Sequence, residues 1–542
     1  MRCLNSSIPT LRLAAVVLAA FAFAFAGTVI GNAKPEPGDK LTRADRALRE
    51  GDFEAAEKMF REALTKDPHD KDARLGLSFT LLKRRQLQDA YDHAARVILA
   101  DPLSARAHSL LGAAILASGD FRNSVEEFRT AISINANDAP AIAGLAMVDF
   151  YENRLDQALR GLRRASSLEP DEPDYVFNLG QAAARSERYK EAADAYERFL
   201  SIAPKTDADR RGRIRGLIDF LRYLGKQSAL YIPSGESKTL VPFESFDERP
   251  ILRVRVNGGK EELRFVLDTG SGMSVVSEQT AKRLGLRPVA QGGLARAVGG
   301  GGKFGIVYGF LSSLEIGDVR VQNVPVYIRR FYDEKNPVDG YVGLSIISKF
   351  IATVDYGKRL FSLVRHGQTD NFDGWKPIYR IATPDAPRTT ESIASSVEIP
   401  LRTTSSGFLS GEVVLNGLER PQNFIIDTGA SISVVSEKLA EVDNLDAYLQ
   451  PTRLKVFGAA GIAENVKTLT LRRVALGTLI REHLSAAVLD LEPVNETAGF
   501  SQDGILGGNF LRHFRVSFDF QRGVIRLEPL TKVISNQESV PQ

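Results

Sequence analysis

Two short runs of the chain could bring two carboxyl groups together. Residues 268–271 (Asp-Thr-Gly-Ser) recur as residues 427–430 (Asp-Thr-Gly-Ala), 427 minus 268 or 159 positions later. Two carboxyl groups in contact cannot both ionise cheaply, so they share one proton and titrate as a unit. The charged group of such a pair can deprotonate a water that attacks a carbonyl carbon, while the neutral group donates its proton to the carbonyl oxygen.

The segments around the two aspartates are copies of one another. Residues 265–278 match residues 424–437, and a second pair of similar motifs follows at residues 339–343 and 503–507. The three apolar residues before each aspartate predict a buried strand, and the glycine after it allows two facing turns to approach closely. Each copy then has a serine followed by glutamate, which predicts the N-cap of a short helix. These serines are Ser277 and Ser436.

On these motifs each copy resembles one lobe of the retropepsin-like superfamily of aspartic proteases. The resemblance implies two all-β lobes, at residues 240–382 and 397–530, with a proline-containing link around residues 383–396 and a C-terminal tail at residues 531–542. It implies that Asp268 and Asp427 are catalytic and that no cofactor or metal ion is needed. The residues implied to support them, the threonines by hydrogen bonds between the two turns, are Thr269, Gly270, Ser271, Thr428, Gly429 and Ala430.

The two copies differ at the residue after the glycine, which is Ser271 in the first and Ala430 in the second. A hydroxyl that donates to Asp268 would favour its charged form and lower the first pKa of the pair. We therefore expect activity at mildly acid to near-neutral pH. Glycines between the aspartate and the downstream motif, at 299–302, 458 and 461, are expected to form hairpins that close over a substrate, with ordinary surface turns as the alternative.

The first half of the chain carries another repeat. Prolines at 68, 102, 170 and 204 are spaced by 34, twice 34 and 34 residues, and a fixed period of this size indicates a helical solenoid. On this period a large apolar residue begins the second helix of each unit, and a small residue follows three positions later. These residues are Phe53, Leu87, Phe121, Leu155 and Tyr189, and Ala56, Ala90, Ser124, Ala158 and Ala192. The pattern resembles the tetratricopeptide repeat and predicts five copies plus a capping helix over residues 37–226.

Such an array offers a concave surface to a peptide or a partner protein, or it packs against its own neighbouring domain. The expected capping helix, residues 207–226, carries a cluster of arginines. We interpret this cluster as a solvated helix face and not as a nucleic-acid site, because the chain as a whole is almost neutral, with 70 Lys and Arg against 67 Asp and Glu.

The first residues have the order of a secretory signal. Two arginines lead into an apolar run at residues 13–30, and small residues follow at 31–33. We predict a signal peptide over residues 1–33, with an uncleaved N-terminal membrane anchor as the alternative. Export would place the chain in the periplasm or outside the cell, and cleavage would remove its one cysteine, Cys3.

These observations predict a multidomain protein, an all-α tetratricopeptide-repeat solenoid followed by an all-β bilobal acid-protease-like domain. The expected function is that of an exported aspartic endopeptidase, a monomer with one site made by Asp268 and Asp427. Its expected partners are a polypeptide substrate and a protein or peptide on the repeat array, with no nucleic acid and with a membrane only if the N-terminus stays uncleaved. Two alternatives stay open: a non-catalytic peptide-binding or scaffold protein, and a homodimer with two separate sites.

Overall fold

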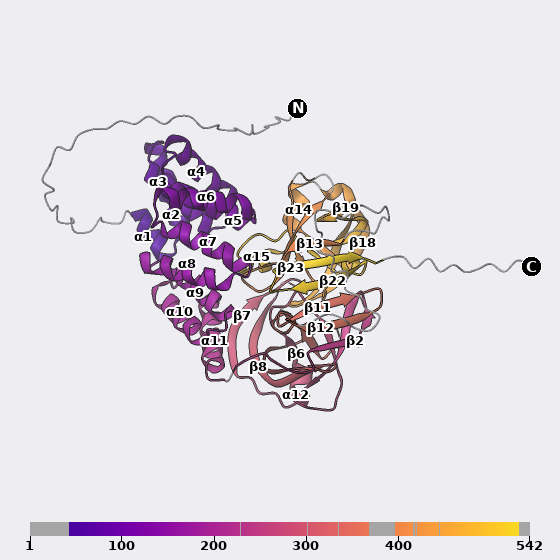
Figure 1. Ribbon diagram of the computed structural model, residues 1–542. Helices are drawn as coiled ribbons and strands as arrows, with labels where there is room; N and C mark the ends of the chain where they lie inside the picture. The colour runs from indigo at the N-terminus through magenta and orange to yellow at the C-terminus, as the bar shows by residue number, and fades with distance from the viewer. Residues whose placement is uncertain are drawn as a thin grey trace, which may run out of the picture. The chain divides into compact units, whose positions relative to one another are not determined.

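A computed structural model describes residues 43–530 except residues 228, 301, 334, 368–395, 416–417, 419 and 444. The predicted signal segment (1–33), the predicted tail (531–542) and residues 383–395 of the predicted link lie outside the described residues. Eleven consecutive helices come first along the described chain, and strands with a few short helices follow them (Figure 1). The predicted fold class, a helical solenoid followed by a β-rich bilobal domain, is confirmed.

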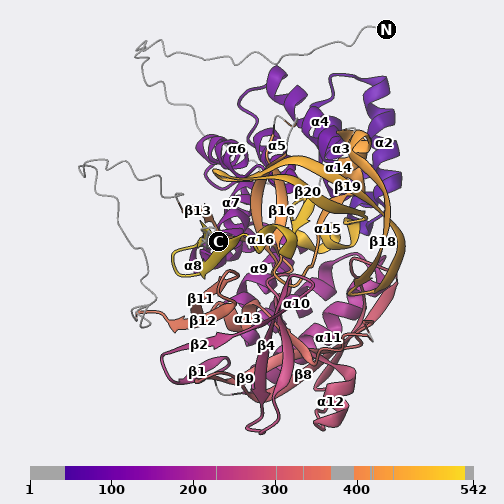
Figure 2. The same ribbon diagram turned by 90° about the vertical axis from the view of Figure 1, so that its right-hand side faces the viewer.

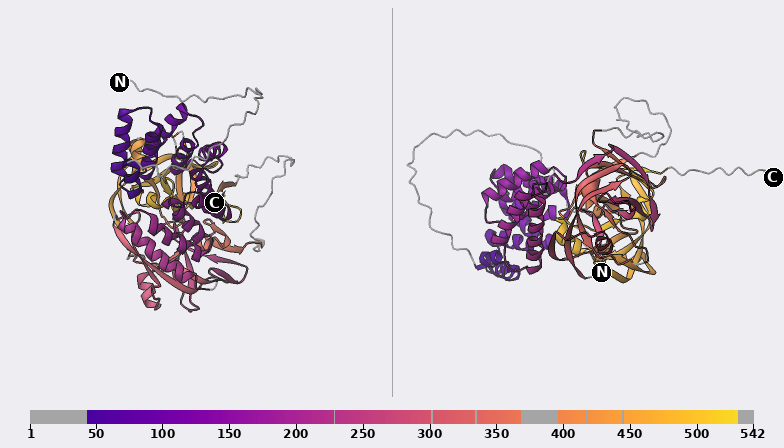
Figure 3. Two further views of the ribbon diagram at one scale, coloured as in Figure 1. Left: turned by 90° about the vertical axis from the view of Figure 1, so that its left-hand side faces the viewer. Right: turned by 90° about the horizontal axis from the view of Figure 1, so that it is seen from below.

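The helical part consists of five antiparallel pairs and one further helix. The bounds are α1 Arg43–Glu50, α2 Phe53–Lys66, α3 Lys71–Lys83, α4 Leu87–Ala100, α5 Ala105–Ser118, α6 Phe121–Ile134, α7 Ala139–Tyr151, α8 Leu155–Leu168, α9 Pro173–Arg185, α10 Tyr189–Ile202 and α11 Ala208–Leu224. Helices α2, α4, α6, α8 and α10 begin at the residues that the period predicts. Figure 3 shows the pairs stacked beside one another, in indigo to magenta.

Close packing of the pairs depends on the small residues of the repeat. Ala56, Ala90, Ser124, Ala158 and Ala192 have no exposed surface. A small side chain at this position allows the two helix axes of a pair to approach, while a large ring one turn later fills the space between neighbouring pairs. The ring of Phe128, for example, is 1% exposed.

Lobe 1 is a mostly antiparallel sheet with the order β1-β9-β6-β10-β5-β4-β8-β7, and β3 pairs with β4. The bounds are β1 Ile232–Gly235, β3 Glu244–Phe246, β4 Arg249–Val256, β5 Leu263–Leu267, β6 Val275–Ser277, β7 Ala290–Arg296, β8 Lys303–Ile316, β9 Val319–Arg329 and β10 Gly340–Val342, with helices α12 Glu278–Arg283 and α13 Leu344–Ile347. Strand β1 lies before residue 240, the predicted start of the lobe. Pro233 is accommodated there because β1 is an edge strand.

Lobe 2 repeats this plan with the order β14-β15-β16-β21-β17-β20-β19-β18. The bounds are β14 Arg402–Thr403, β15 Leu409–Leu415, β16 Gln422–Ile426, β17 Ser433–Ser436, β18 Leu449–Gly458, β19 Gly461–Leu476, β20 Leu479–Leu489 and β21 Gly504–Leu506, with α14 Glu437–Val442, a 3₁₀ helix Leu445–Tyr448, α15 Glu492–Ala498 and α16 Gly508–Leu511. Parallel pairs β5–β10 and β16–β21 occupy equivalent places in the two lobes.

A third sheet joins the two lobes. Its order is β13-β23-β22-β11-β12-β2, with β2 Lys238–Pro242, β11 Phe350–Asp355, β12 Leu360–Arg365, β13 Val397–Pro400, β22 Phe514–Asp519 and β23 Val524–Pro529. Strands β11 and β22, which close lobe 1 and lobe 2, pair with Ala352 opposite Phe518 and with Asp355 opposite Arg515. In Figure 2, β11, β12 and β2 lie side by side. The two lobes therefore share backbone hydrogen bonds as well as side-chain packing.

Candidate active site

Asp268 and Asp427 each follow the last residue of a buried strand, β5 in lobe 1 and β16 in lobe 2. The backbone N–H of Asp268 donates to the carbonyl oxygen of Val342 at 3.0 Å, and that of Asp427 donates to Leu506 at 3.0 Å. Both acceptors lie in the parallel neighbour strand, β10 or β21. Each aspartate is thus fixed by the strand of its own downstream Gly motif.

The two turns are joined by four hydrogen bonds from two threonines. Oγ1 of Thr269 donates to the carbonyl oxygen of Ile426 at 2.7 Å, and Oγ1 of Thr428 donates to that of Leu267 at 2.6 Å. Each hydroxyl oxygen also accepts a bond from the backbone N–H of the other threonine, at 3.1 and 3.0 Å. Both threonines have no exposed surface. This reciprocal arrangement holds the strand ends that carry the two aspartates against each other.

The two glycines permit the contact between the carboxyl groups. A Cβ atom added at Gly429 would lie 2.6 Å from Oδ1 of Asp268, and one added at Gly270 would overlap the carboxyl group of Asp427. Each glycine also donates its N–H to the carboxyl oxygen of the aspartate in its own turn, at 2.9 Å for Gly270 and 2.7 Å for Gly429. Any side chain at these positions would push the two carboxyl groups apart.

Burial raises the pKa of both carboxyl groups. The pKa of Asp268 lies well above its ordinary value because the group is buried and because the charge of Asp427 lies beside it. Burial also raises the pKa of Asp427, although hydrogen bonds from backbone N–H groups oppose the shift. The pair therefore keeps a proton at a higher pH than an exposed aspartate does, and the proton belongs to the pair.

Ser271 does not have the expected hydrogen bond. Its Oγ donates to the carbonyl oxygen of Met273 at 2.7 Å, within its own turn, and not to Asp268. Backbone carbonyl oxygens two residues on are common partners of serine hydroxyls in turns, and here this local acceptor takes the proton. The expected lowering of the first pKa by Ser271 is therefore wrong, and burial dominates instead.

Asp339 and Asp503, which begin the downstream motifs, have structural roles that sequence reasoning did not assign. Oδ2 of Asp339 accepts from the backbone N–H of Arg264 at 2.8 Å, and Oδ2 of Asp503 accepts from that of Asn423 at 3.0 Å. These bonds connect each downstream motif to the strand, β5 or β16, that precedes the Asp-Thr-Gly turn. The sequence indicated these roles only in that an aspartate begins the downstream motif in both copies. Ser277 and Ser436 cap α12 and α14 as predicted.

The glycine-rich segments form two hairpins whose tips touch. Hairpin 1 is β7–β8 of lobe 1 and hairpin 2 is β18–β19 of lobe 2. A Cβ atom added at Gly299 would lie 2.7 Å from Cα of Gly458, and one added at Gly300 would lie 2.6 Å from Cα of Gly461. Glycine is required here because the two backbones meet directly.

Arg329 connects these hairpins to the aspartates, and sequence reasoning missed it. At the end of β9, its guanidinium donates to the carbonyl oxygen of Ala459 in the tip of hairpin 2 and lies 3.9 Å from the ring centre of Phe304 in hairpin 1. Burial lowers the pKa of Arg329, and its charge acts on Asp268, where it opposes the rise in pKa. No motif marks an isolated arginine of this kind.

Helix α11 packs on hairpin 1, so the repeat array contacts the lobes. Nη1 of Arg213 donates to the carbonyl oxygen of Leu294 at 2.9 Å, and the ring of Phe220 stacks on that of Tyr308 at 4.1 Å. Gly216 faces the backbone of β7 so closely that a Cβ atom would overlap it. The arginines of this helix therefore do not all lie on a solvated face, because Arg213 contacts hairpin 1. The sequence pattern could not show which element would pack against this helix.

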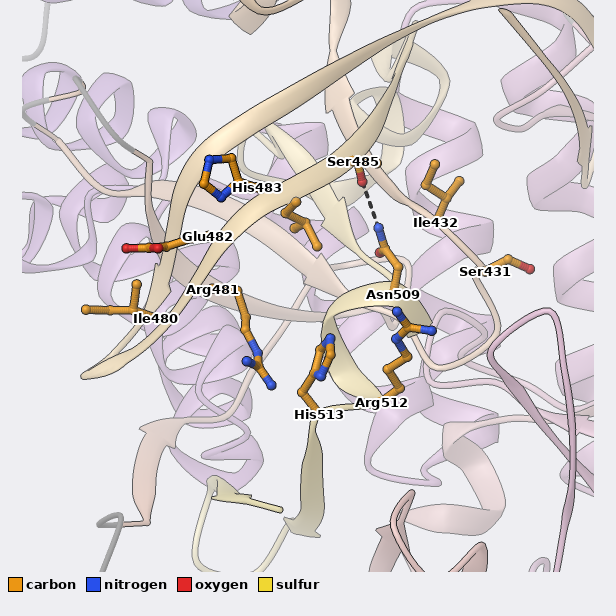
Figure 4. A pocket seen from close by; sticks show the side chains of 11 residues that line it. Ser431, Ile432, Ile480, Arg481, Glu482, His483, Ser485, Asn509, Arg512 and His513 are labelled. Atoms are coloured by element: carbon orange, nitrogen blue, oxygen red, sulfur yellow. Dashed lines mark hydrogen bonds between the residues drawn. The ribbon is translucent and has the colours of Figure 1, made fainter. Parts of the chain in front are cut away.

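A cavity of about 1340 Å³ adjoins the turn that carries Asp268 and extends over the concave side of the repeat array. A second cavity, of about 830 Å³, lies in lobe 2 (Figure 4). There burial, followed by the charges of Arg481 and Arg512, lowers the pKa of His513 to about 4. Among the described residues no cluster of His, Cys, Asp and Glu could hold a metal ion. Within the same residues no helix has the length and apolar character needed to cross a bilayer.

Comparison with known families finds matches in both halves of the chain. The aspartyl protease family matches residues 252–346 and 411–510. Two tetratricopeptide repeat families match residues 47–114 and 144–206.

Curated relatives match a limited part of the chain. Anaphase-promoting complex subunit 3 of Schizosaccharomyces pombe is 28% identical over 157 residues, which are 29% of this chain and 24% of the relative. BBSome complex member BBS4 of Bos taurus is 22% identical over 158 residues, or 29% and 30% of the two chains. This chain thus spans less than a third of the length of either relative.

Solved structures resemble about a third of the chain. TTC0263, a thermophilic TPR protein in Thermus thermophilus, has 24% sequence identity and a TM-score of 0.29, and the match covers 32% of this chain and 95% of that one. The APC/C hetero-tetramer Cut9–Hcn1 has 17% identity and a TM-score of 0.30, with 34% and 36% covered. The family matches and the fold agree that this chain combines tetratricopeptide repeats with an aspartyl protease domain built from two segments.

Proposed function

We propose that the chain is an exported aspartic endopeptidase that hydrolyses peptide bonds through a water held between Asp268 and Asp427. One observation carries this proposal: two half-buried carboxyl groups lie in contact, and reciprocal threonine bonds hold the turns that bear them. Two carboxylates held in contact and partly removed from water are costly for the fold. This cost is explained if the pair uses its shared proton for acid–base catalysis.

In the proposed mechanism the pair carries one proton and one negative charge. The charged carboxylate accepts a proton from the water as its oxygen attacks the peptide carbonyl carbon, and the neutral carboxyl group donates its proton to the carbonyl oxygen. A tetrahedral diol forms, and its collapse transfers a proton to the leaving nitrogen and breaks the C–N bond. The N–H groups of Gly270 and Gly429, which already donate to the carboxyl oxygens, hold both groups in place.

The arrangement supports one site in each chain. Strands β11 and β22 pair within the chain, and the side chains of Thr353 and Ser517 are 2.9 Å apart across that pair. A monomer with a single pair of aspartates is therefore the proposed working form. Export, with the predicted N-terminal signal, and recruitment of a protein or peptide by the repeat array complete the proposal.

The test compares three substitutions in a peptide-library cleavage assay with and without a statine-type inhibitor. Asp268→Asn and Asp427→Asn should each abolish cleavage that the inhibitor blocks. Asp318→Asn, at an exposed turn between β8 and β9, is the matched control and should cleave normally. Absence of cleavage by the unaltered protein, or cleavage that survives both changes, would contradict the proposal. Residual activity after one change would point to two separate sites in a dimer.

A further inference from the structure

The cavity of about 1340 Å³ beside Asp268 is bounded by the lobes and by the repeat array. In the lobes its walls include residues 270–273, residues 295–297 of hairpin 1 and residues 405–408. On the array most of its wall residues belong to α3, α5, α7 and α9, the first helices of their pairs, and to α11, with a few from α6, α8 and α10. The volume exceeds the roughly 300–1,000 Å³ of pockets for small molecules, so it suits a segment of polypeptide.

Positive side chains outnumber negative ones in the walls of this cavity. The nine basic residues are Lys83, Arg85, Arg106, Arg185, Arg210, Arg213, Arg296, Arg329 and Lys349. The six acidic residues are Glu169, Glu172, Asp174, Glu187, Asp207 and Glu496. The difference, nine minus six, is three positive charges, which favours a ligand of negative charge.

Five of the arginines form no ion pair with any described residue, in contrast to Lys83, Lys349 and Arg296. One of the five, Arg106, lies 5.2 Å from the ring centre of Phe79 in α3. Arg185, in α9, lies 3.9 Å from the ring centre of Phe150 and donates to the carbonyl oxygens of Thr404 and Ser405. Burial lowers its pKa to about 10. Positive charge is thus partly desolvated here with only neutral groups around it.

The remaining three are Arg329, Arg213 and Arg210, which contact the hairpins or the array. Arg329 contacts the tips of both hairpins and acts electrostatically on Asp268. Arg213, in α11, donates to the backbone of hairpin 1. Arg210, one turn earlier in the same helix, lies 4.6 Å from the ring centre of Phe177 on the array. A ligand carboxylate could meet each of them in turn.

We propose that this cavity binds an acidic segment of the polypeptide substrate and leads it from the concave side of the array to the aspartates. The inference rests on the proposed protease function and adds the class of substrate. Carboxylates of the segment would form charge-assisted hydrogen bonds with arginines that have no ion pair among the described residues. The cavity would then extend the cleft of the lobes into the array, so that the array itself is part of the substrate site.

The test measures binding apart from cleavage. Fluorescently labelled peptides of one length, in an acidic form and in the form with each Asp and Glu replaced by Asn and Gln, are titrated into the protein with both Asp268→Asn and Asp427→Asn. Anisotropy should show that the acidic peptide binds about tenfold or more tightly at low salt, and that added salt reduces the difference. A neutral or basic peptide that binds equally well would overturn the inference.

Three further variants in the same background locate the site. Arg210→Gln should weaken binding of the acidic peptide about three- to tenfold, and Arg210→Lys should restore most of it. Arg160→Gln, at an exposed position of α8 and outside the cavity, is the matched control and should bind as the parent does. Unchanged affinity for Arg210→Gln would contradict the placement. Circular dichroism of each variant checks that the helices remain folded.

The outcomes separate this inference from the proposed function. Tight binding of the acidic peptide without any cleavage by the unaltered protein would keep the inference and reject the protease. Cleavage that depends on both aspartates but shows no preference for acidic peptides would keep the protease and reject the inference.

Discussion

Hairpin 1 and hairpin 2 occupy equivalent places in the two lobes, but their surroundings differ. Helix α11 packs along β7 of hairpin 1, with Lys303 paired to Asp209 and Phe220 stacked on Tyr308. On hairpin 2, Phe457 and Ile462 near the tip remain 45% and 37% exposed. Two copies of one unit are therefore packed differently, one covered by a helix and the other exposed near its tip. We expect hairpin 1 to act as a fixed wall and hairpin 2 to open for substrate entry.

The largest expected effect tests what the two lobes still share. Gly270→Ala and Gly429→Ala each place a methyl group against the carboxyl group of the other lobe. We expect each change to lower kcat/KM at least hundredfold, because the carboxyl groups can no longer share a proton at contact distance. Steady-state cleavage kinetics measure the loss. Near-normal activity in either variant would contradict the dyad geometry.

Thr269→Val and Thr428→Val should have closely similar effects on stability. Each change removes a buried hydroxyl that donates one bond and accepts another, and two backbone groups of the opposite turn lose these bonds. The free energy of unfolding should fall by about 1–3 kcal/mol in each case. Urea denaturation measures this quantity. A large difference between the two variants would show that the two turns are not equivalent.

If α11 is moved away from hairpin 1, the difference in hydrogen exchange between the two hairpins should disappear. Gly216→Leu places a side chain into the backbone of β7, where no space exists. Hydrogen exchange should then increase in β7 and β8 towards the rate of hairpin 2, with little change in hairpin 2 itself. Gly212→Leu, on the same helix with nothing within 4 Å, is the control and should leave the exchange of hairpin 1 unchanged. Equal exchange of both hairpins in the parent would reject the comparison.

The pH dependence of stability should reveal the shared proton. A carboxyl group whose pKa is raised by folding stabilises the fold most below its ordinary pKa, and this contribution disappears as pH rises through the folded pKa. The pKa values of Asp268 and Asp427 are both raised. We therefore expect the Tm of Asp268→Asn to rise relative to that of the parent as the pH increases above the ordinary pKa of aspartate. A Tm difference that stays constant as the pH increases would contradict the raised pKa.

The smallest expected effect concerns the residue that distinguishes the two turns. Ser271→Ala makes the first turn identical to the second, yet the hydroxyl donates only to Met273. The acid limb of the pH–rate profile should therefore stay where it is in the parent. A clear shift of that limb would restore the role that the sequence suggested for Ser271.

Local patterns predicted much of this molecule. The 34-residue period located the starts of five helices, and apolar triplets located strands β5 and β16. Both patterns could be read because helices and strands depend on residues that are close together in the sequence. The contacts of Arg329, the stacking of Phe220 on Tyr308 and the pairing of β11 with β22 join residues that are remote in sequence. No spacing rule encodes such contacts, and hence the shared sheet, the covered hairpin and the cavity required the structure.

The sheet shared by the two lobes has a consequence for synthesis of the protein. Strand β11 emerges from the ribosome well before its partner β22, which ends at Asp519, and before the outer strand β23, which ends at Pro529. Until about 160 further residues have been made, from Asp355 to Asp519, one edge of β11 has no neighbour and is open to pairing with other chains. A nascent chain would need protection of that edge throughout this interval, and the two halves of the site could be fixed against each other only at its end.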